Sequence, residues 1–208
     1  MIEQGSPEWF AARCGKATAS RIADVIAKTK SGPSASRANY AAQLIAERLT
    51  GVVAESFTNS AMQWGSDKEP EACDAYAWET DAELEEVGFI NHPKIGMSGA
   101  SPDRLVGEDG LLEVKCPNTA THLDTLLGQP VASKYVTQMQ WQMACTGRKW
   151  CDFVSFDPRL PSDLRLFRQR IMRDDVMIAE LESDVRAFLA EVADKLTQLN
   201  ALRLKKAA

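Results

Sequence analysis

The stretch Ser101-Pro102-Asp103-Arg104 is followed, after a short glycine-bounded turn, by Leu112-Glu113-Val114-Lys115. Residues two apart in a β-strand point to the same face, so Glu113 and Lys115 share one face of the second segment. If the two segments pair across the turn, Asp103 comes to lie beside Glu113 and Lys115. The sequence therefore predicts that two carboxylates and one ammonium group meet at a single place.

This group of side chains suits one kind of chemistry. Two neighbouring carboxylates make an oxygen-donor site of the kind that Mg²⁺ or Mn²⁺ prefers. A lysine beside them can orient a water or help to deprotonate it, as metal-assisted phosphodiester hydrolysis requires. The pattern resembles the PD-(D/E)XK nuclease signature, with Pro102-Asp103 as its first half and Glu113-Val114-Lys115 as its second. The alternative is a charged hairpin edge in solvent, but Leu111, Leu112 and Val114 favour a buried strand.

Length and composition indicate one globular domain. The chain has 208 residues, of which 45% are hydrophobic, enough to form a substantial core. We expect a single nuclease domain over 1–208, with a mainly helical part to about 80, a catalytic part over about 81–173 and a final helix over about 174–204. No apolar run approaches the length of a membrane span, and the N-terminus lacks a signal-peptide layout, which predicts a cytoplasmic protein with no membrane partner.

The charges are unevenly placed along the chain. A net charge of −5 argues against a protein that coats nucleic acid over its whole surface. Residues 11–48 carry seven bases and two acids, whereas residues 67–86 carry nine acids and one lysine. This arrangement suits a protein that binds phosphates in one place and metal ions nearby; solvated helix faces are the alternative.

Apolar periodicity, capping residues and turn residues predict a single α/β unit with a central mixed sheet flanked by helices. The expected helices cover 7–15, 21–27, 36–49, 66–78, 121–127, 133–145 and 174–204. The expected strands cover 84–90, 97–101, 103–106, 111–116, 150–156 and 164–172.

A third carboxylate, Glu69, lies in a segment before the expected strands and could join the metal site. Its alternative role is local. Ser66 and Glu69 have the spacing of a capping box, in which Glu69 only closes a helix N-terminus. Pro70 fits best in a first helical turn, which argues against a helix start as early as Ser66 and favours the functional role.

Two other groups of polar side chains could contact a substrate. Gln138 and Gln142 lie four apart on an expected helix and share a face with Tyr135, which allows neutral hydrogen bonds to phosphates, sugars or water. Arg13 with Thr18-Ala19-Ser20 at a helix start makes an anion pocket possible. A semi-polar helix face and an ordinary capped helix are the respective alternatives.

Taken together, the chain resembles the lambda-type exonucleases, the YqaJ viral recombinase branch of the PD-(D/E)XK nucleases. The matching motifs run in family order across most of the chain: Trp9 through Arg13, Thr18-Ala19-Ser20, Trp64-Gly65 with Glu69, Ser101-Pro102-Asp103, Glu113-Val114-Lys115-Cys116-Pro117, Gln138-Met139-Gln140 and Phe156-Asp157-Pro158-Arg159.

The resemblance implies a restriction-endonuclease-like fold and an ATP-independent 5′→3′ exonuclease in the cytoplasm of a bacterial host cell. Such an enzyme degrades one strand of linear double-stranded DNA from a 5′-phosphorylated end and leaves a 3′ overhang for phage-type single-strand-annealing recombination. It works as a homotrimeric ring around DNA together with a phage single-strand annealing protein. Two Mg²⁺ ions per active site are implied, with Mn²⁺ as a substitute. A PD-(D/E)XK endonuclease and a non-catalytic DNA-binding module of the same fold are the alternatives.

The resemblance also assigns roles to residues. The implied metal ligands are Asp103, Glu113 and the Val114 carbonyl, with Glu69 completing the site. Lys115 would position and activate the attacking water. The implied DNA-binding residues are Arg13, Ser20 and Ser101 at the 5′-terminal phosphate, Gln138 beside the metals, and Gln140. The family helix usually carries an aromatic residue where Trp141 or Gln142 falls here, which leaves the role of Gln142 open.

Overall fold

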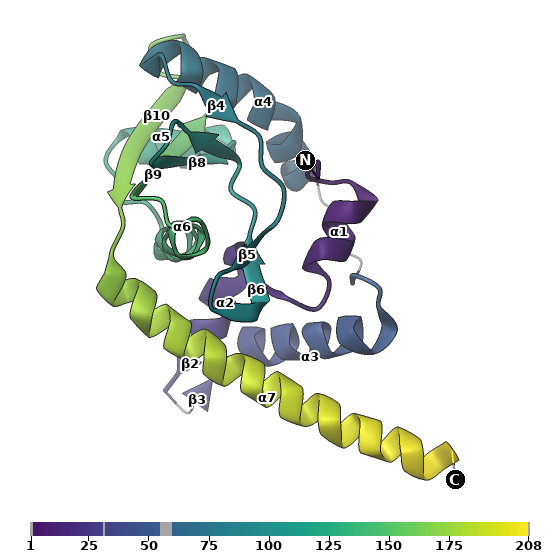
Figure 1. Cartoon of the computed structure of the whole chain (residues 1–208). Helices are drawn as coiled ribbons and strands as arrows, with labels where there is room; N and C mark the ends of the chain where they lie inside the picture. The colour runs from purple at the N-terminus through teal and green to yellow at the C-terminus, as the bar shows by residue number, and fades with distance from the viewer. Residues whose placement is uncertain (1, 31, 55–59, 208) are drawn as a thin grey trace.

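The computed structural model describes residues 2–30, 32–54 and 60–207 (Figure 1). In chain order its elements are α1 (Pro7–Arg13), β1 (Ala17–Thr18), a 3₁₀ turn (Ala19–Arg21), α2 (Ile22–Ile26), β2 (Lys28–Thr29), β3 (Gly32–Pro33), α3 (Ala35–Thr50), α4 (Ser60–Thr80), β4 (Leu84–Glu85), β5 (Ile90–His92), β6 (Ile95–Ala100), β7 (Arg104–Val106), β8 (Gly110–Lys115), α5 (Thr119–Leu126), α6 (Ser133–Thr146), β9 (Trp150–Phe156), β10 (Leu166–Met172) and α7 (Asp175–Ala207).

The hairpin expected from the sequence is present as β7 and β8. These strands pair antiparallel, with Arg104 opposite Leu112 and Val106 opposite Gly110. Extending this register by one residue places Asp103 opposite Glu113. Gly110 has no room for a side chain, since a Cβ there would lie 2.2 Å from the Trp150 ring. The pairing that the sequence predicts across the turn is therefore confirmed.

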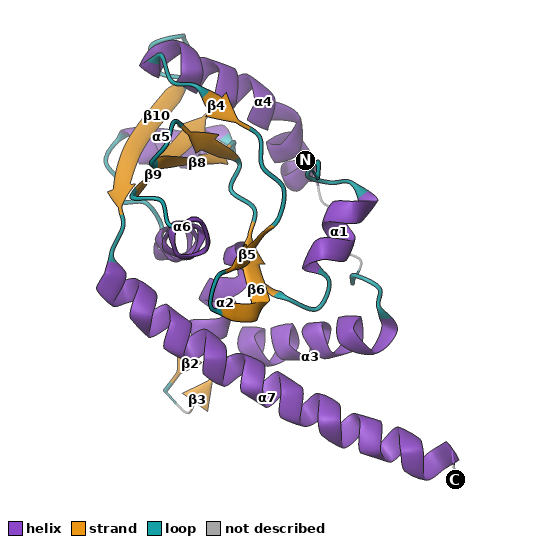
Figure 2. Ribbon diagram, in the orientation of Figure 1, coloured by secondary structure: helices purple, strands orange, loops and turns teal. Residues whose placement is uncertain are grey.

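The main sheet has five strands in the order β10-β9-β8-β7-β4. Strands β8 and β9 run parallel, and the other neighbours run antiparallel, so the predicted mixed sheet is confirmed (Figure 2). The connection between the two parallel strands contains α5 and α6, which is long enough for the crossover that parallel pairing needs.

Opposite faces of this sheet pack against different helices. Leu112 and Val114 of β8 belong to a core with Ala72, Cys73 and Tyr76 of α4. Their neighbour Leu111 packs on the other face, against Met139 and Met143 of α6. Because side chains alternate along a strand, Glu113 and Lys115 share the α6 face with Leu111.

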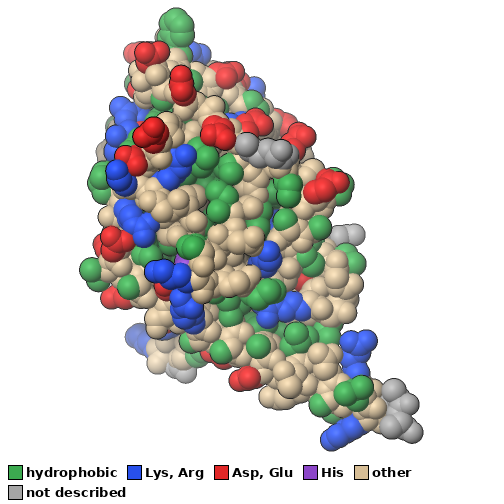
Figure 3. Space-filling view, viewed as in Figure 1, with side chains coloured by type: hydrophobic (Ala, Val, Ile, Leu, Met, Phe, Trp, Pro, Cys, Tyr) green, Lys and Arg blue, Asp and Glu red, His purple; other side chains and the backbone are tan. Residues whose placement is uncertain are grey.

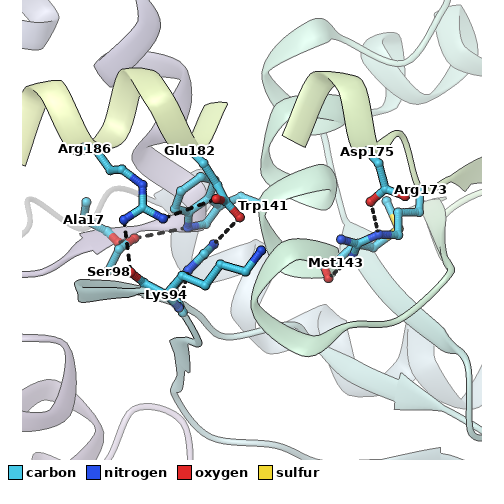
Figure 4. Close-up of polar contacts among 10 residues, drawn as sticks. Ala17, Lys94, Ser98, Trp141, Met143, Arg173, Asp175, Glu182 and Arg186 are labelled. Carbon is cyan, nitrogen blue, oxygen red and sulfur yellow. Dashed lines mark hydrogen bonds and ion pairs between the residues drawn. The ribbon is translucent and has the colours of Figure 1, made fainter. Parts of the chain in front are cut away.

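A second layer joins helices from both ends of the chain to a small sheet in the order β1-β6-β5. Apolar side chains of α2, α3, α6 and α7 form one buried cluster there. Figure 4 shows polar contacts that hold α7 and the segment before it against the core. Arg186 donates to the Lys94 carbonyl at 3.1 Å, and Arg173, just before α7, donates to the Met143 carbonyl at 2.5 Å.

Several expected boundaries differ from the structure. The helix expected over 66–78 is α4, which begins at Ser60 and contains Pro70 in its interior. Both the capping-box alternative for Ser66 and the argument from Pro70 are therefore wrong. A proline removes one backbone hydrogen bond from a helix, and burial of Ala72, Cys73 and Tyr76 against the sheet offsets this loss. The two-residue strands β1, β2 and β3 are too short to leave a periodic signal.

Across residues 2–30, 32–54 and 60–207, no helix combines the length and the apolar character that crossing a membrane requires.

Candidate active site

The predicted residues meet around a cavity of about 160 Å³. It lies between α1, the segment after β1, the β6–β7 connection, β8 and α6. Seven of the predicted site residues line it: Arg13, Ser20, Ser101, Asp103, Glu113, Lys115 and Gln138. Trp9, Gln4 and Phe89 complete much of the remaining wall.

The Glu113 carboxylate is fully buried and accepts three hydrogen bonds. Its Oε1 atom accepts from Gln138 at 2.7 Å and from the Lys115 ammonium. Its Oε2 atom accepts from Gln142 at 2.6 Å. A buried carboxylate is tolerated only when it is paired in this way. The open question about Gln142 is thereby answered, because it positions Glu113.

Asp103 lies immediately before β7, the other strand of the hairpin. Its Oδ2 atom accepts from the Val114 backbone N–H at 2.6 Å, which ties it to β8. Burial and the nearby Glu113 raise the pKa of Asp103 well above its usual value, although Lys115 opposes this. Burial alone would lower the pKa of Lys115, but Glu113 and Asp103 raise it above its usual value. Lys115 is therefore an ammonium group at neutral pH.

The donor set fits a hard divalent cation. Asp103 and Glu113 contribute carboxylate oxygens, and the Val114 carbonyl belongs to the same strand as Glu113. Across the described part of the chain, no three side chains of His, Cys, Asp or Glu gather closely enough to hold an ion. Mg²⁺ commonly takes only one or two carboxylates and keeps several waters, so two carboxylates suffice. Burial and the nearby Glu113 raise the pKa of Asp103, and a bound cation would favour its ionised form.

Glu69 lies outside this cavity. Its Oε1 atom is 3.2 Å from Nη1 of Arg104, and both residues line a neighbouring cavity of about 300 Å³. The reason is that α4 packs against the face of β8 that bears Leu112 and Val114, opposite to the face of Glu113. A role for Glu69 at the metal site stays a prediction.

Arg13, Ser20 and Ser101 line the same cavity as Asp103, Glu113 and Lys115. The Arg13 guanidinium lies over the Trp9 ring, 4.0 Å from its centre. Within the described residues, the Arg13 side chain makes no hydrogen bond, and Arg13 lines the cavity. A guanidinium with unused N–H groups beside two hydroxyls is a site for an anion.

Gln140 lies away from the cavity, and its predicted DNA-binding role stays a prediction. Its side chain is 2% exposed. It donates to the Met172 carbonyl at 2.8 Å and accepts from the Asp174 N–H at 2.9 Å, which joins α6 to the β10–α7 connection. The helical period explains this, since Gln140 points away from the face that carries Gln138 and Gln142.

Among the cavity residues that were not assigned roles from the sequence, Gln4 and Trp9 hold parts of the site in place. Gln4 donates to the Pro102 carbonyl at 2.8 Å and so holds the residue before Asp103. Trp9 donates to the Ser101 hydroxyl at 2.8 Å. Both contacts span more than 90 residues of sequence, and no local pattern could have revealed them.

The β7–β8 hairpin, its two carboxylates and its lysine define a nuclease with the restriction-endonuclease-like fold. Residues 8–149, more than half of the chain, match the model of the YqaJ-like viral recombinase domain. The chain therefore belongs to the YqaJ-like viral recombinase family, as its resemblance to lambda-type exonucleases implies.

Two solved structures of one exonuclease resemble the chain over nearly its whole length. It is 53% identical to an alkaline exonuclease, LHK-Exo, from Laribacter hongkongensis, over 98% of this chain and 100% of that one, with a TM-score of 0.89. A structure of LHK-Exo in complex with dAMP matches with the same identity and coverage and a TM-score of 0.90. The predicted enzyme class, a DNA exonuclease, is thereby confirmed.

A more distant structure supports the fold alone. A phage related exonuclease from Haemophilus somnus 129PT is 16% identical over 88% of this chain and 96% of that one, with a TM-score of 0.72. The comparison with curated proteins found no match.

Proposed function

We propose that this protein is a Mg²⁺-dependent, ATP-independent exonuclease that degrades one strand of linear duplex DNA in the 5′→3′ direction. Its product would be a 3′ single-stranded overhang for phage-type annealing recombination. The observation that carries this proposal is one cavity lined by two groups of side chains. Asp103, Glu113 and Lys115 form one group, here called the acidic side, and Arg13, Ser20 and Ser101 form the other, called the basic side.

The acidic side supplies the hydrolytic chemistry. Asp103, Glu113 and the Val114 carbonyl would hold the divalent cations, which when bound neutralise charge on a phosphodiester and promote ionisation of water. Lys115 is charged and can donate hydrogen bonds to a water or to a phosphate oxygen. Gln138 and Gln142 keep the Glu113 carboxylate in one orientation.

The basic side supplies the end specificity. Arg13, Ser20 and Ser101 offer donors that match the oxygens of a terminal phosphate. Holding that phosphate would place the next phosphodiester bond beside Asp103 and Glu113, so that binding energy is used to orient the reaction. Cleavage would therefore begin at a 5′-phosphorylated end.

We further propose a homotrimeric ring with a phage single-strand annealing protein as partner. Phosphate neutralisation dominates DNA affinity, and a chain of net charge −5 holds DNA weakly on its own. Acidic side chains gather over α4 and β4 in the space-filling view (Figure 3). A closed ring retains DNA without many strong contacts per subunit. Light scattering should give three times the monomer mass, and a monomer at micromolar concentration would contradict the ring.

The direct test compares linear duplex with covalently closed circular duplex, with Mg²⁺ or with EDTA. We expect mononucleotide release from the linear DNA only, and only with Mg²⁺. Asp103→Ala, Glu113→Ala and Lys115→Ala should each abolish release while the circular dichroism spectrum stays unchanged. Cleavage of closed circles would indicate an endonuclease, and a lack of any metal-dependent cleavage would indicate a binding module. A fully active Asp103→Ala variant would remove the basis of the assignment.

A further inference from the structure

Trp9 contacts two of the three donor residues on the basic side of the cavity. Its indole N–H donates to the Ser101 hydroxyl at 2.8 Å, across 92 residues of sequence. The face of the same ring lies 4.0 Å from the Arg13 guanidinium carbon. A single half-buried side chain on α1 therefore touches two of the three residues proposed to bind the terminal phosphate.

The same pairing of a tryptophan with a serine occurs a second time in the core. Trp141 donates through its indole N–H to the Ser98 hydroxyl at 3.2 Å, and Ser98 then donates to the Ala17 carbonyl at 2.6 Å (Figure 4). Once a hydroxyl has accepted from an indole, its own proton is free to be donated onward. At Ser98 a protein atom, the Ala17 carbonyl oxygen, accepts that proton.

Ser101 differs from Ser98 in this second step. An indole N–H is only a donor, so the Ser101 oxygen must be the acceptor in its bond with Trp9. Within the described residues, no protein atom accepts the remaining Ser101 proton. Ser101 lines the cavity, where such a proton can meet an anion.

We propose that Trp9 is the positioning residue for the terminal phosphate: its N–H directs the Ser101 proton into the cavity, and its ring face fixes Arg13. This inference rests on the proposed 5′-phosphate specificity and assigns the residue that prepares it. A ring face under a guanidinium leaves the in-plane N–H donors available for a planar, bidentate contact. Trp9 thus orients two donors before the substrate arrives, which lowers the ordering cost of binding.

The test measures kcat/KM on 5′-phosphorylated and on 5′-hydroxyl linear duplex, and takes the ratio as the end preference. Trp9→Phe keeps a ring face for Arg13 but removes the N–H. We expect it to lower the end preference about tenfold, as is typical for losing a hydrogen bond that serves a charged group. Ser101→Ala should lower it by a similar factor. Circular dichroism and thermal unfolding report whether each variant is still folded.

The double variant tests whether Trp9 acts through Ser101. If the Trp9 N–H acts only through the Ser101 hydroxyl, Trp9→Phe combined with Ser101→Ala should lose about tenfold in total. Independent effects would multiply to about a hundredfold. Trp9→Leu, which also removes the ring face, should lose more than Trp9→Phe. Trp78→Phe is the matched control, since Trp78 is 91% exposed and lies outside the cavity.

The outcomes separate the inference from the proposed function. A wild-type enzyme with no end preference contradicts the 5′-phosphate specificity, and the inference fails with it. An end preference that survives Trp9→Phe overturns the inference alone. Losses that multiply in the double variant, or that affect both substrates equally, also overturn it.

Discussion

The Gln142 amide nitrogen lies 2.6 Å from Oε2 of Glu113, with both side chains fully buried. Gln138 lies one helical turn away and donates at 2.7 Å to the other oxygen, Oε1, which also contacts Lys115. The two glutamines therefore make different contributions. Gln142 is the side-chain partner of Oε2 in the described structure, whereas Oε1 has two such partners.

Gln142→Leu should destabilise the protein more than Gln138→Leu. Losing Gln142 leaves a buried carboxylate oxygen without a donor, at a cost of about 1–3 kcal/mol. Losing Gln138 leaves Lys115 on Oε1, so a smaller loss is expected. Urea unfolding of the metal-free protein gives both values. Equal losses in the two variants would show that Gln142 has no special role in holding Glu113.

Asp103→Asn should stabilise the metal-free protein at neutral pH and remove its response to divalent cations. Burial and Glu113 raise the pKa of Asp103, so its ionised form opposes folding, and stability falls as pH rises above the ordinary aspartate pKa. Asparagine removes that charge and can still accept from the Val114 N–H. Thermal unfolding with EDTA and with Mg²⁺ checks this. An unchanged Mg²⁺-induced rise in Tm in the variant would exclude Asp103 as a ligand.

Asp157 should stabilise the fold in a pH-dependent way. Burial would raise its pKa, but hydrogen bonds from Arg159 and Thr119 outweigh burial and hold the pKa at about 2, below the usual 3.8. Its contribution is therefore complete above pH 3.8 and is lost as pH falls towards 2.

We expect Asp157→Asn to lower the free energy of unfolding at pH 7 by about 1–2 kcal/mol, a value reduced for solvent screening because Arg159 is 47% exposed. The difference from wild type should shrink on acidification. Denaturant titrations at pH 7 and near pH 2.5 measure it. The exposed Asp163→Asn is the control. A difference that stays constant with pH would contradict an ionic role for Asp157.

Gly110→Ala should weaken the hairpin that carries the site. The added Cβ would lie 2.2 Å from the Trp150 ring, and overpacking of this kind costs about 1–3 kcal/mol. Gly96→Ala in β6 is the matched control, because a Cβ there meets no heavy atom within 4 Å. Urea unfolding should show a loss for Gly110→Ala and almost none for Gly96→Ala. Equal stabilities would mean that the Trp150 ring moves aside at little cost.

Local patterns were enough to predict the hairpin and the long elements. The alternation around Glu113 and Lys115 and the turn before Gly110 act over a few residues, so their geometry follows from strand periodicity alone. The stripe of apolar residues in α7 likewise predicts a helix without reference to the rest of the chain. The start of α4 could not be predicted in this way, because packing on the sheet overrides the local preference of Pro70.

The sequence by itself determined that Asp103, Glu113 and Lys115 lie together. A short turn sets the pairing of the two strands, and the alternation of side chains along a strand then places all three on one face. Only the tertiary structure decided which helices complete the site. It placed α6 on the Glu113 face and α4 on the opposite one, so that Gln142 reaches Glu113 while Glu69 pairs with Arg104. It also brought Trp9 to Ser101. Such contacts depend on how whole faces pack, and packing is set by the summed apolar surface of the chain rather than by any short motif.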